Sequence, residues 1–195
     1  MKRMLALLAV PALAVSLVAP AQAALPGADA KVKAKDLVSA AQVAKVLGVA
    51  KVDVKKTKVK QGYAIKSCKK SSTFKLKSGL SGSYMPNPMT GATTGDIAVW
   101  ETKNAATAKK VLKGYKVGAK CGTMKSEFGT VTVSKLKTPK AGKGSAGYKI
   151  DVEGFTLGSM VAIKKNKVVI VNLTVDGKAD AAKNGKLLKK AIKKA

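Results

Sequence analysis

The hydrophobic positions along the chain predict three amphipathic helices. The first begins at Ser39, which can form a capping box with Gln42, and ends at Gly48, a residue type that favours helix C-termini. The second follows Asn104, a common N-cap residue, and the third covers residues 178–194. Each helix has apolar residues at helical spacing on one face: Ala40, Val43, Ala44 and Leu47; Ala108, Val111, Leu112 and Tyr115; Ala181, Leu188, Ala191 and Ile192.

Alternating apolar and polar positions predict strands between these helices. The alternation is clearest over residues 148–153, where every second residue is charged. Residues 157–163 and 168–175 predict a hairpin, and its second arm is apolar on both faces, which places it centrally in a sheet. Further strands are predicted around residues 52–54, 74–76, 97–101 and 131–136. Trp100 and Tyr115 are expected in the core.

The segment from Ser78 to Gly95 has a different composition and predicts a long loop. It reads SGLSGSYMPNPMTGATTG, so that glycine, serine and proline recur throughout it. A long structureless stretch inside a compact domain is usually either functional or disordered. If this one is functional, Tyr84, Met85 and Met89 are its ligand-binding candidates, because aromatic and methionine side chains on a loop make adaptable apolar contacts.

The order of these elements predicts an α+β fold. Consecutive strands with short connections favour an antiparallel sheet, and we expect the helices to pack on one face of it as a two-layer sandwich. Residues 36–195 are long enough to form a single domain with its own core. Residues 24–35 precede this domain and predict a flexible segment.

Residues 1–23 have the features of a secretory signal peptide. Lys2 and Arg3 precede an apolar run over residues 4–18, and small residues at positions 21 and 23 suit a cleavage site. The run is shorter than the roughly 20 residues that span a membrane, although an uncleaved N-terminal anchor is the alternative. We therefore expect a secreted or envelope-associated, extracytoplasmic protein with no membrane span after signal cleavage.

The chain is strongly basic, and its positive charge comes almost entirely from lysine. The formal net charge is +28, and Arg3 is the only arginine. Lysine attracts polyanions as a point charge, whereas base-specific recognition usually relies on arginine, so we expect no specific nucleic-acid partner. The lysine surface either attracts anionic envelope polymers or only keeps the protein soluble. The polyanion-contact candidates lie in the last helix: Lys186, Lys189, Lys190, Lys193 and Lys194.

Cys68 and Cys121 are the two cysteines of the chain. An exported protein meets an oxidising environment, so a disulfide between them is the default expectation. Such a bond would stabilise the fold by roughly 4 kcal/mol in the chain-entropy model. Two free thiols or a metal pair are the alternative, although no histidine or third cysteine is present to complete a metal site.

The chain offers few groups for acid–base chemistry. Histidine, the commonest general base and metal ligand near neutral pH, is absent from it. Asp151 and Glu153 have the i, i+2 spacing that could form a glycosidase carboxylate pair, but the solvent side of a strand with lysine partners explains them better. We therefore expect a non-catalytic protein without a cofactor or a metal.

The second half of the chain follows a recurring order of elements. It contains a strand at residues 97–100, a helix at 104–113, Tyr115 and Cys121, and then strands, an apolar hairpin and a final helix. This order resembles the extracellular sensor domains of actinobacterial receptor serine/threonine kinases and related exported lipoproteins. Residues 37–48 also look like the opening helix of that family. The resemblance implies an antiparallel sheet flanked by helices, a cleft that could take a ligand, and a sensing or binding role at the cell envelope.

Two binding hypotheses follow from the sequence, and an enzyme with an unrecognised site is a third alternative. The first is an exported, sensor-like binding module of the cell envelope, with a small or polymeric and possibly anionic ligand. The second is a cationic protein that adheres to anionic envelope polymers through its lysines. Binding that disappears at high salt would favour the second hypothesis, because screening weakens exposed charges.

Overall fold

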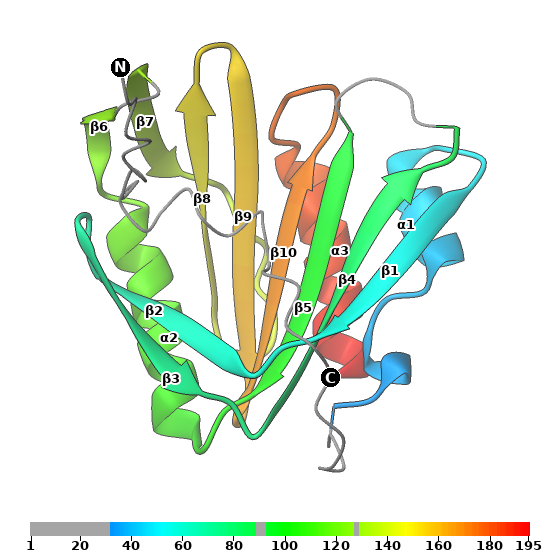
Figure 1. The fold of residues 1–195 in the computed structure, drawn as a ribbon, viewed down its shortest axis with the longest axis horizontal. Coiled ribbons are helices and arrows are strands. Elements are labelled where there is room, and N and C mark those ends of the chain that lie inside the picture. Colours follow the sequence, from blue (N-terminus) through cyan, green and yellow to red (C-terminus); the bar gives the residue numbers. More distant parts are fainter. Residues whose placement is uncertain (1–31, 89–92, 127–128) are drawn as a thin grey trace, which may run out of the picture.

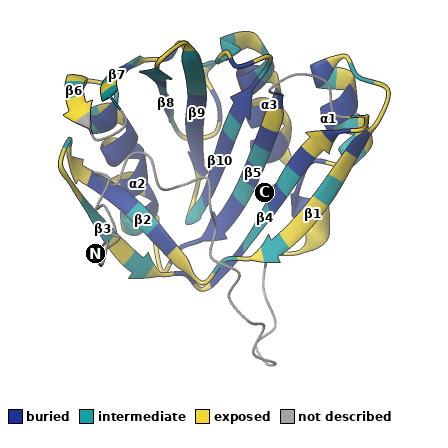
Figure 2. Ribbon diagram, turned by 45° about the horizontal axis from the view of Figure 1, so that its top comes forward, coloured by how far each residue is buried: buried dark blue, intermediate teal, exposed yellow. Residues whose placement is uncertain are grey.

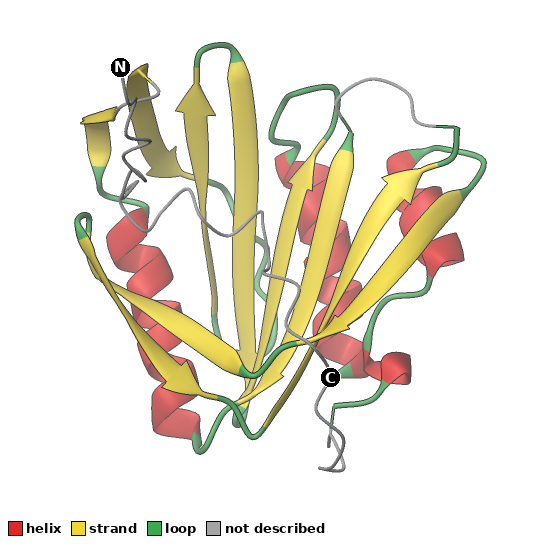
Figure 3. Cartoon of the chain, viewed as in Figure 1, coloured by secondary structure: helices red, strands yellow, loops and turns green. Residues whose placement is uncertain are grey.

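The computed structural model describes residues 32–88, 93–126 and 129–195. Within these residues the chain forms an eight-stranded antiparallel sheet, a separate two-stranded hairpin and three α-helices (Figure 1, Figure 3). The predicted α+β class and the antiparallel sheet are confirmed. The predicted signal peptide lies outside the described residues.

The elements have the following bounds. The helices are α1 (Ala40–Leu47), α2 (Ala105–Gly118) and α3 (Ala181–Lys194), and a short 3-10 helix, η2, covers Ala34–Asp36. The strands are β1 (Val52–Lys58), β2 (Gln61–Ser67), β3 (Lys70–Lys75), β4 (Ser78–Pro86), β5 (Thr94–Glu101), β6 (Gly122–Ser126), β7 (Gly129–Lys135), β8 (Ser145–Val152), β9 (Phe155–Lys164) and β10 (Lys167–Thr174).

The large sheet has β10 near its centre, as its two-sided apolar sequence predicts. The strand order is β1-β4-β5-β10-β9-β8-β7-β6, and β2 pairs only with β3. The hairpin of β9 and β10 is in register from Lys164 opposite Lys167 to Gly158 opposite Leu173. Residues 168–171 of β10 are all buried, so this strand needs cover on both faces of the sheet (Figure 2).

The helices lie on both faces of the sheet, and the prediction that they share one face is wrong. Along β9, Met160 and Ala162 belong to one core, which α1 and α3 close with residues such as Val43 and Leu188. Val161 and Ile163 point the other way, into a second core that α2 and the β2–β3 hairpin close. Side chains alternate across a strand, so one sheet separates the two cores. Trp100 and Tyr115 are both in the second core, as predicted.

Side-chain caps begin all three α-helices. Ser39 and Gln42 form the predicted capping box at α1. The Asn104 side chain accepts a 2.9 Å hydrogen bond from the Thr107 amide and begins α2. Asp180 accepts a 2.8 Å hydrogen bond from the Lys183 amide, so α3 starts three residues later than the pattern of residues 178–194 predicts.

The residues before α1 are held against the sheet. Val32 is buried, and its amide donates to the Ser78 hydroxyl over 3.1 Å. Asp36 is also buried and lies 3.9 Å from the Lys167 ammonium. For residues 32–35 the prediction of a flexible segment is therefore wrong, and residues 24–31 lie outside the described part. None of the helices in the described ranges combines the length and the apolar character needed to cross a membrane.

Candidate functional site

Half of the segment predicted as a long loop is strand β4. Residues 78–86 pair with β1 on one side and with β5 on the other, so their hydrogen bonds come from distant parts of the chain. The small residues serve close packing: a Cβ at Gly79 would lie only 2.7 Å from the Val59 carbonyl oxygen. Glycine in a strand often marks such a close approach, and here it does not mark a loop.

The three residues proposed for that loop do not form a common site. Tyr84 is 1% exposed and lies in the core shared with α1 and α3, which contradicts its assignment as a surface ligand contact. Met85, the next residue, points to the other face and is 44% exposed. Met89 lies outside the described residues. Side chains alternate along β4, so Tyr84 and Met85 lie on opposite faces of the strand, a separation that a predicted loop does not imply.

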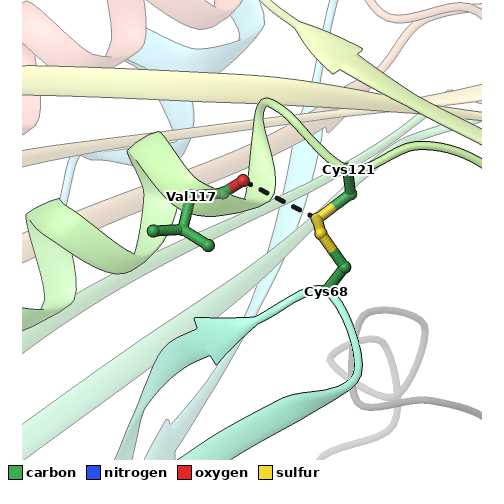
Figure 4. The surroundings of a disulfide bond; sticks show 3 residues. All are labelled: Cys68, Val117 and Cys121. Carbon is green, nitrogen blue, oxygen red and sulfur yellow. Dashed lines mark hydrogen bonds between the residues drawn. A yellow bond between two sulfur atoms is a disulfide. The ribbon is translucent and has the colours of Figure 1, made fainter.

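The predicted disulfide between Cys68 and Cys121 is present (Figure 4). It joins the turn between β2 and β3 to the residue just before β6, with 5.4 Å between the two Cα atoms. The Cys121 sulfur also lies 3.6 Å from the Val117 carbonyl oxygen in the last turn of α2. The bond therefore fixes the β2–β3 hairpin against the C-terminal end of α2.

The two carboxylates considered for acid–base chemistry have different surroundings. The Lys149 ammonium lies 3.0 Å from Asp151, and the Thr156 hydroxyl donates to Asp151 over 2.7 Å. Partial burial raises the pKa of Asp151, but the hydrogen bonds from Thr156 and Lys149 and the lysine charge outweigh it and hold the pKa below its usual value. Glu153 lies in the turn after β8 rather than on the strand. Asp151 therefore has the predicted lysine partner.

The five candidate lysines lie along the exposed side of α3. The opposite side of the helix is buried by Leu187, Leu188, Ala191 and Ile192, which contact the sheet core. This apolar stripe leaves the remaining positions in solvent, and the candidates occupy them: Lys186, Lys189, Lys190, Lys193 and Lys194 are all exposed.

Four of these lysines surround one shallow hollow. Lys189, Lys190, Lys193 and Lys194 line it together with Gln42 of α1, and its volume is about 400 Å³. Contacts between α1 and α3 bring Gln42 to this place from far away in the sequence. Among the described residues, no acidic side chain forms an ion pair with any of these lysines. We call this feature the lysine hollow.

The lining of the lysine hollow is positively charged, because four of its five residues are lysines. Like charges on neighbouring lysines repel each other, and an anion bound nearby relieves this repulsion. Its lining contains no carboxylate. In the described part of the chain, no three acidic, cysteine or histidine residues lie close enough to hold a metal ion.

Comparisons with known proteins support the fold. No family model matches the sequence, and no curated protein matches it either. The structure is similar to the extracellular domain of PknH from Mycobacterium tuberculosis, with a TM-score of 0.56, 14% identity, and coverage of 81% of this chain and 93% of that one. It also matches a Mycobacterium smegmatis protein, an Rv0999 ortholog, with a TM-score of 0.49, 14% identity, and coverage of 78% and 95%. The resemblance stated from the sequence is thus confirmed at the level of the fold.

Proposed function

We propose that this protein is a non-catalytic binding module that works outside the cytoplasm and holds anionic envelope polymers at the lysine hollow. The observation that carries the proposal is the gathering of Lys189, Lys190, Lys193 and Lys194 around one hollow, with Gln42 as a neutral hydrogen-bonding partner. The other candidate site, on residues 78–95, is less well supported because Tyr84 is buried in the core.

The chemistry of the lysine hollow favours a repeating anion over a single small one. Lysine neither stacks nor grips in a bidentate manner, so each ammonium contributes mainly charge. Individual exposed charge contacts are weak in water, and several of them must act together to hold a ligand. A polymer with regularly spaced phosphate or carboxylate groups can contact all four lysines at once.

Two further observations support a place outside the cytoplasm. The first residues have the pattern of a secretory signal peptide, and the fold contains a disulfide, which persists in oxidising compartments. The PknH domain that this fold resembles is itself extracellular. The absence of histidine from the sequence supports a role without proton transfer.

The test compares two sets of four lysines on two helices. One variant changes Lys189, Lys190, Lys193 and Lys194 of α3 to glutamine, and the control changes Lys109, Lys110, Lys113 and Lys116 of α2, which are also exposed. Both variants lose the same charge from a helix, so they differ only in whether the lost lysines line the hollow. Binding of sodium polyphosphate is measured by titration calorimetry at roughly 50 mM and 500 mM salt, since screening grows over this range.

We expect the α3 variant to lose at least about tenfold more affinity than the α2 variant at low salt, and both proteins to bind weakly at high salt. Equal losses in the two variants would show that the net charge acts without a site. Affinity that persists at high salt in the α3 variant would also contradict the proposal.

A further inference from the structure

A second hollow lies on the sheet face that α3 covers, beyond the N-terminal end of that helix. Strands β7, β8 and β9 and the two residues Lys178 and Ala179 line it, and its volume is about 500 Å³. This size falls within the roughly 300–1,000 Å³ of small-molecule sites. It shares no lining residue with the lysine hollow. We call it the threonine hollow.

The threonine hollow has balanced charge in a strongly basic protein. Its lining contains two lysines, Lys149 and Lys178, and two carboxylates, Asp151 and Glu153. The chain as a whole has 38 basic and 10 acidic residues, so a fifth of its carboxylates lie at this one place. A site with this balance offers no net attraction to a polyanion, in contrast to the lysine hollow.

A row of hydrogen-bonding side chains crosses four strands, and its members on β7, β8 and β9 line the threonine hollow. The strand register places Thr123 opposite Thr132, Thr132 opposite Asp151, and Asp151 opposite Thr156. The hydroxyls of Thr123 and Thr132 are 3.1 Å apart, and the Thr156 hydroxyl donates to Asp151 over 2.7 Å. Side chains directly opposite each other share one face, so the row presents its hydroxyls and carboxylate in one direction.

Asp151, the hydrogen-bond acceptor in this row, is held in place by Lys149 and Thr156. The Lys149 ammonium lies 3.0 Å from one oxygen of Asp151 while Thr156 donates to the other, and the two ion-pair side chains are 40% and 35% exposed. These contacts leave part of each group accessible to a ligand. Lys149 supplies donors and Asp151 supplies lone pairs within one hydrogen-bond length of each other.

One aromatic residue adds an apolar surface to the lining. Phe155 at the start of β9 lines the threonine hollow and is half-buried, and its ring lies against Gly177, where a Cβ would be 3.4 Å from the ring. The Glu153 side chain lies against Gly129, the first residue of β7. The hollow thus combines one apolar ring with donors and acceptors.

We propose that the threonine hollow binds a neutral carbohydrate, as a single sugar unit or a short stretch of a glycan chain. A sugar hydroxyl donates and accepts hydrogen bonds at once, so an adjacent lysine and carboxylate fit it better than either charge alone. The C–H face of a sugar ring is apolar and suits the Phe155 ring. Because the charges of the hollow balance, anions drawn to the basic surface do not compete with a neutral ligand there.

The test uses neutral chito-, manno- and xylo-oligosaccharides added to the full-length mature protein, followed by amide NMR at roughly 500 mM salt, where exposed charge contacts are screened. We expect at least one of these oligosaccharides to shift the amide signals of Thr132, Asp151 and Thr156. The Asp151→Asn variant should bind this oligosaccharide about tenfold or more weakly than the wild type, because a hydrogen bond to a charged group and the ion pair are lost.

A matched control is available at the opposite edge of the sheet. Asp53 pairs with Lys51 over 3.6 Å and has the same Lys-x-Asp spacing as Asp151, but it lines neither hollow. Asp53→Asn should bind the oligosaccharide like the wild type. Thr132→Val removes one hydroxyl without changing charge, and its affinity should also fall. Spectra as well dispersed as those of the wild type confirm that each variant is folded.

Two outcomes would overturn the proposal: none of the neutral oligosaccharides shifts these signals, or Asp151→Asn and Asp53→Asn bind alike. The α3 lysine variant should bind the neutral oligosaccharide normally. Failure at the threonine hollow is therefore distinguishable from failure at the lysine hollow.

Discussion

The hydroxyl of Tyr84 donates a 2.5 Å hydrogen bond to the main-chain carbonyl oxygen of Val38. Both residues are buried, and they are 46 positions apart in the sequence. The bond joins β4 to Val38, which precedes the N-cap residue of α1. It places an aromatic residue of a glycine-rich segment in the core, with its polar end satisfied by the main chain.

Replacement of Tyr84 by phenylalanine should lower the free energy of unfolding by about 1–2 kcal/mol. The ring still fills its place, but the buried Val38 carbonyl loses its partner. Denaturant unfolding followed by circular dichroism measures the loss. Met85→Leu, on the exposed side of the same strand, should change stability by less than about 0.5 kcal/mol. Equal effects of the two changes would contradict a buried role for the Tyr84 hydroxyl.

Stability should fall at alkaline pH, and Tyr84 should account for part of the fall. Burial raises the pKa of Tyr84 from 10.0 to about 12. Between these values the unfolded state releases the phenolic proton while the folded state keeps it, so folding stability is full below pH 10 and decreases as pH rises to about 12. A shift of two pKa units corresponds to roughly 3 kcal/mol of folding free energy.

The contribution of Tyr84 can be isolated by difference. The stability gap between the wild type and Tyr84→Phe should close and then change sign as pH rises through about 12, because the wild type loses more free energy on ionisation than the hydroxyl contributes, while phenylalanine has no proton to lose. Burial also raises the pKa of Tyr115 and Tyr148, so both proteins should still become less stable. A gap that stays constant across this range would show that Tyr84 ionises alike in both states.

Loss of the disulfide should weaken the β2–β3 hairpin more than the central sheet. The bond joins residues 53 positions apart, and closing a loop of this length stabilises a fold by roughly 4 kcal/mol in the chain-entropy model. Serine at both Cys68 and Cys121 should lower the free energy of unfolding by an amount of this order. Hydrogen exchange should rise most in β2 and β3, which pair only with each other. Uniform exchange across both sheets would argue against a local role.

Gly114→Ala should push α2 away from β2. A Cβ at position 114 would lie 2.7 Å from the main-chain nitrogen of Ile65 and 2.8 Å from its carbonyl oxygen, and backbone cannot yield as a side chain can. We expect a destabilisation of about 1–3 kcal/mol, despite the better helix propensity of alanine. A Cβ at Gly118, one turn later, would meet side chains alone, the tip of Ile65 at 3.1 Å and the Tyr148 ring at 3.4 Å, so Gly118→Ala should be nearly neutral. Thermal unfolding of both variants distinguishes the two cases.

The candidate site was only partly readable from the sequence. The lysines of α3 could be selected because a helical apolar stripe leaves their positions in solvent. The threonine hollow could not be found in this way, because Thr132, Asp151 and Thr156 come from three strands. Their alignment depends on the strand register. The alternation over residues 148–153 could have shown only that Lys149 and Asp151 share a face.

Local signals in the sequence determined the helix starts at Ser39 and Asn104, the central place of the apolar strand at residues 167–174, and the basic character of the surface. These features depend on neighbours within a few residues, or on composition alone. The sequence also limited a disulfide to one pairing, since it holds only two cysteines, and the structure showed that the bond is present.

Only the tertiary structure decided that residues 78–86 form a strand, that Tyr84 points inward, and that helices cover both faces of the sheet. The hydrogen bonds that make β4 a strand come from β1 and β5, and small residues there allow the close approach of neighbouring backbone. A segment with a loop-like composition can form a strand when neighbouring strands on both sides accept and donate its backbone hydrogen bonds. Those neighbouring strands cannot be identified from the segment itself.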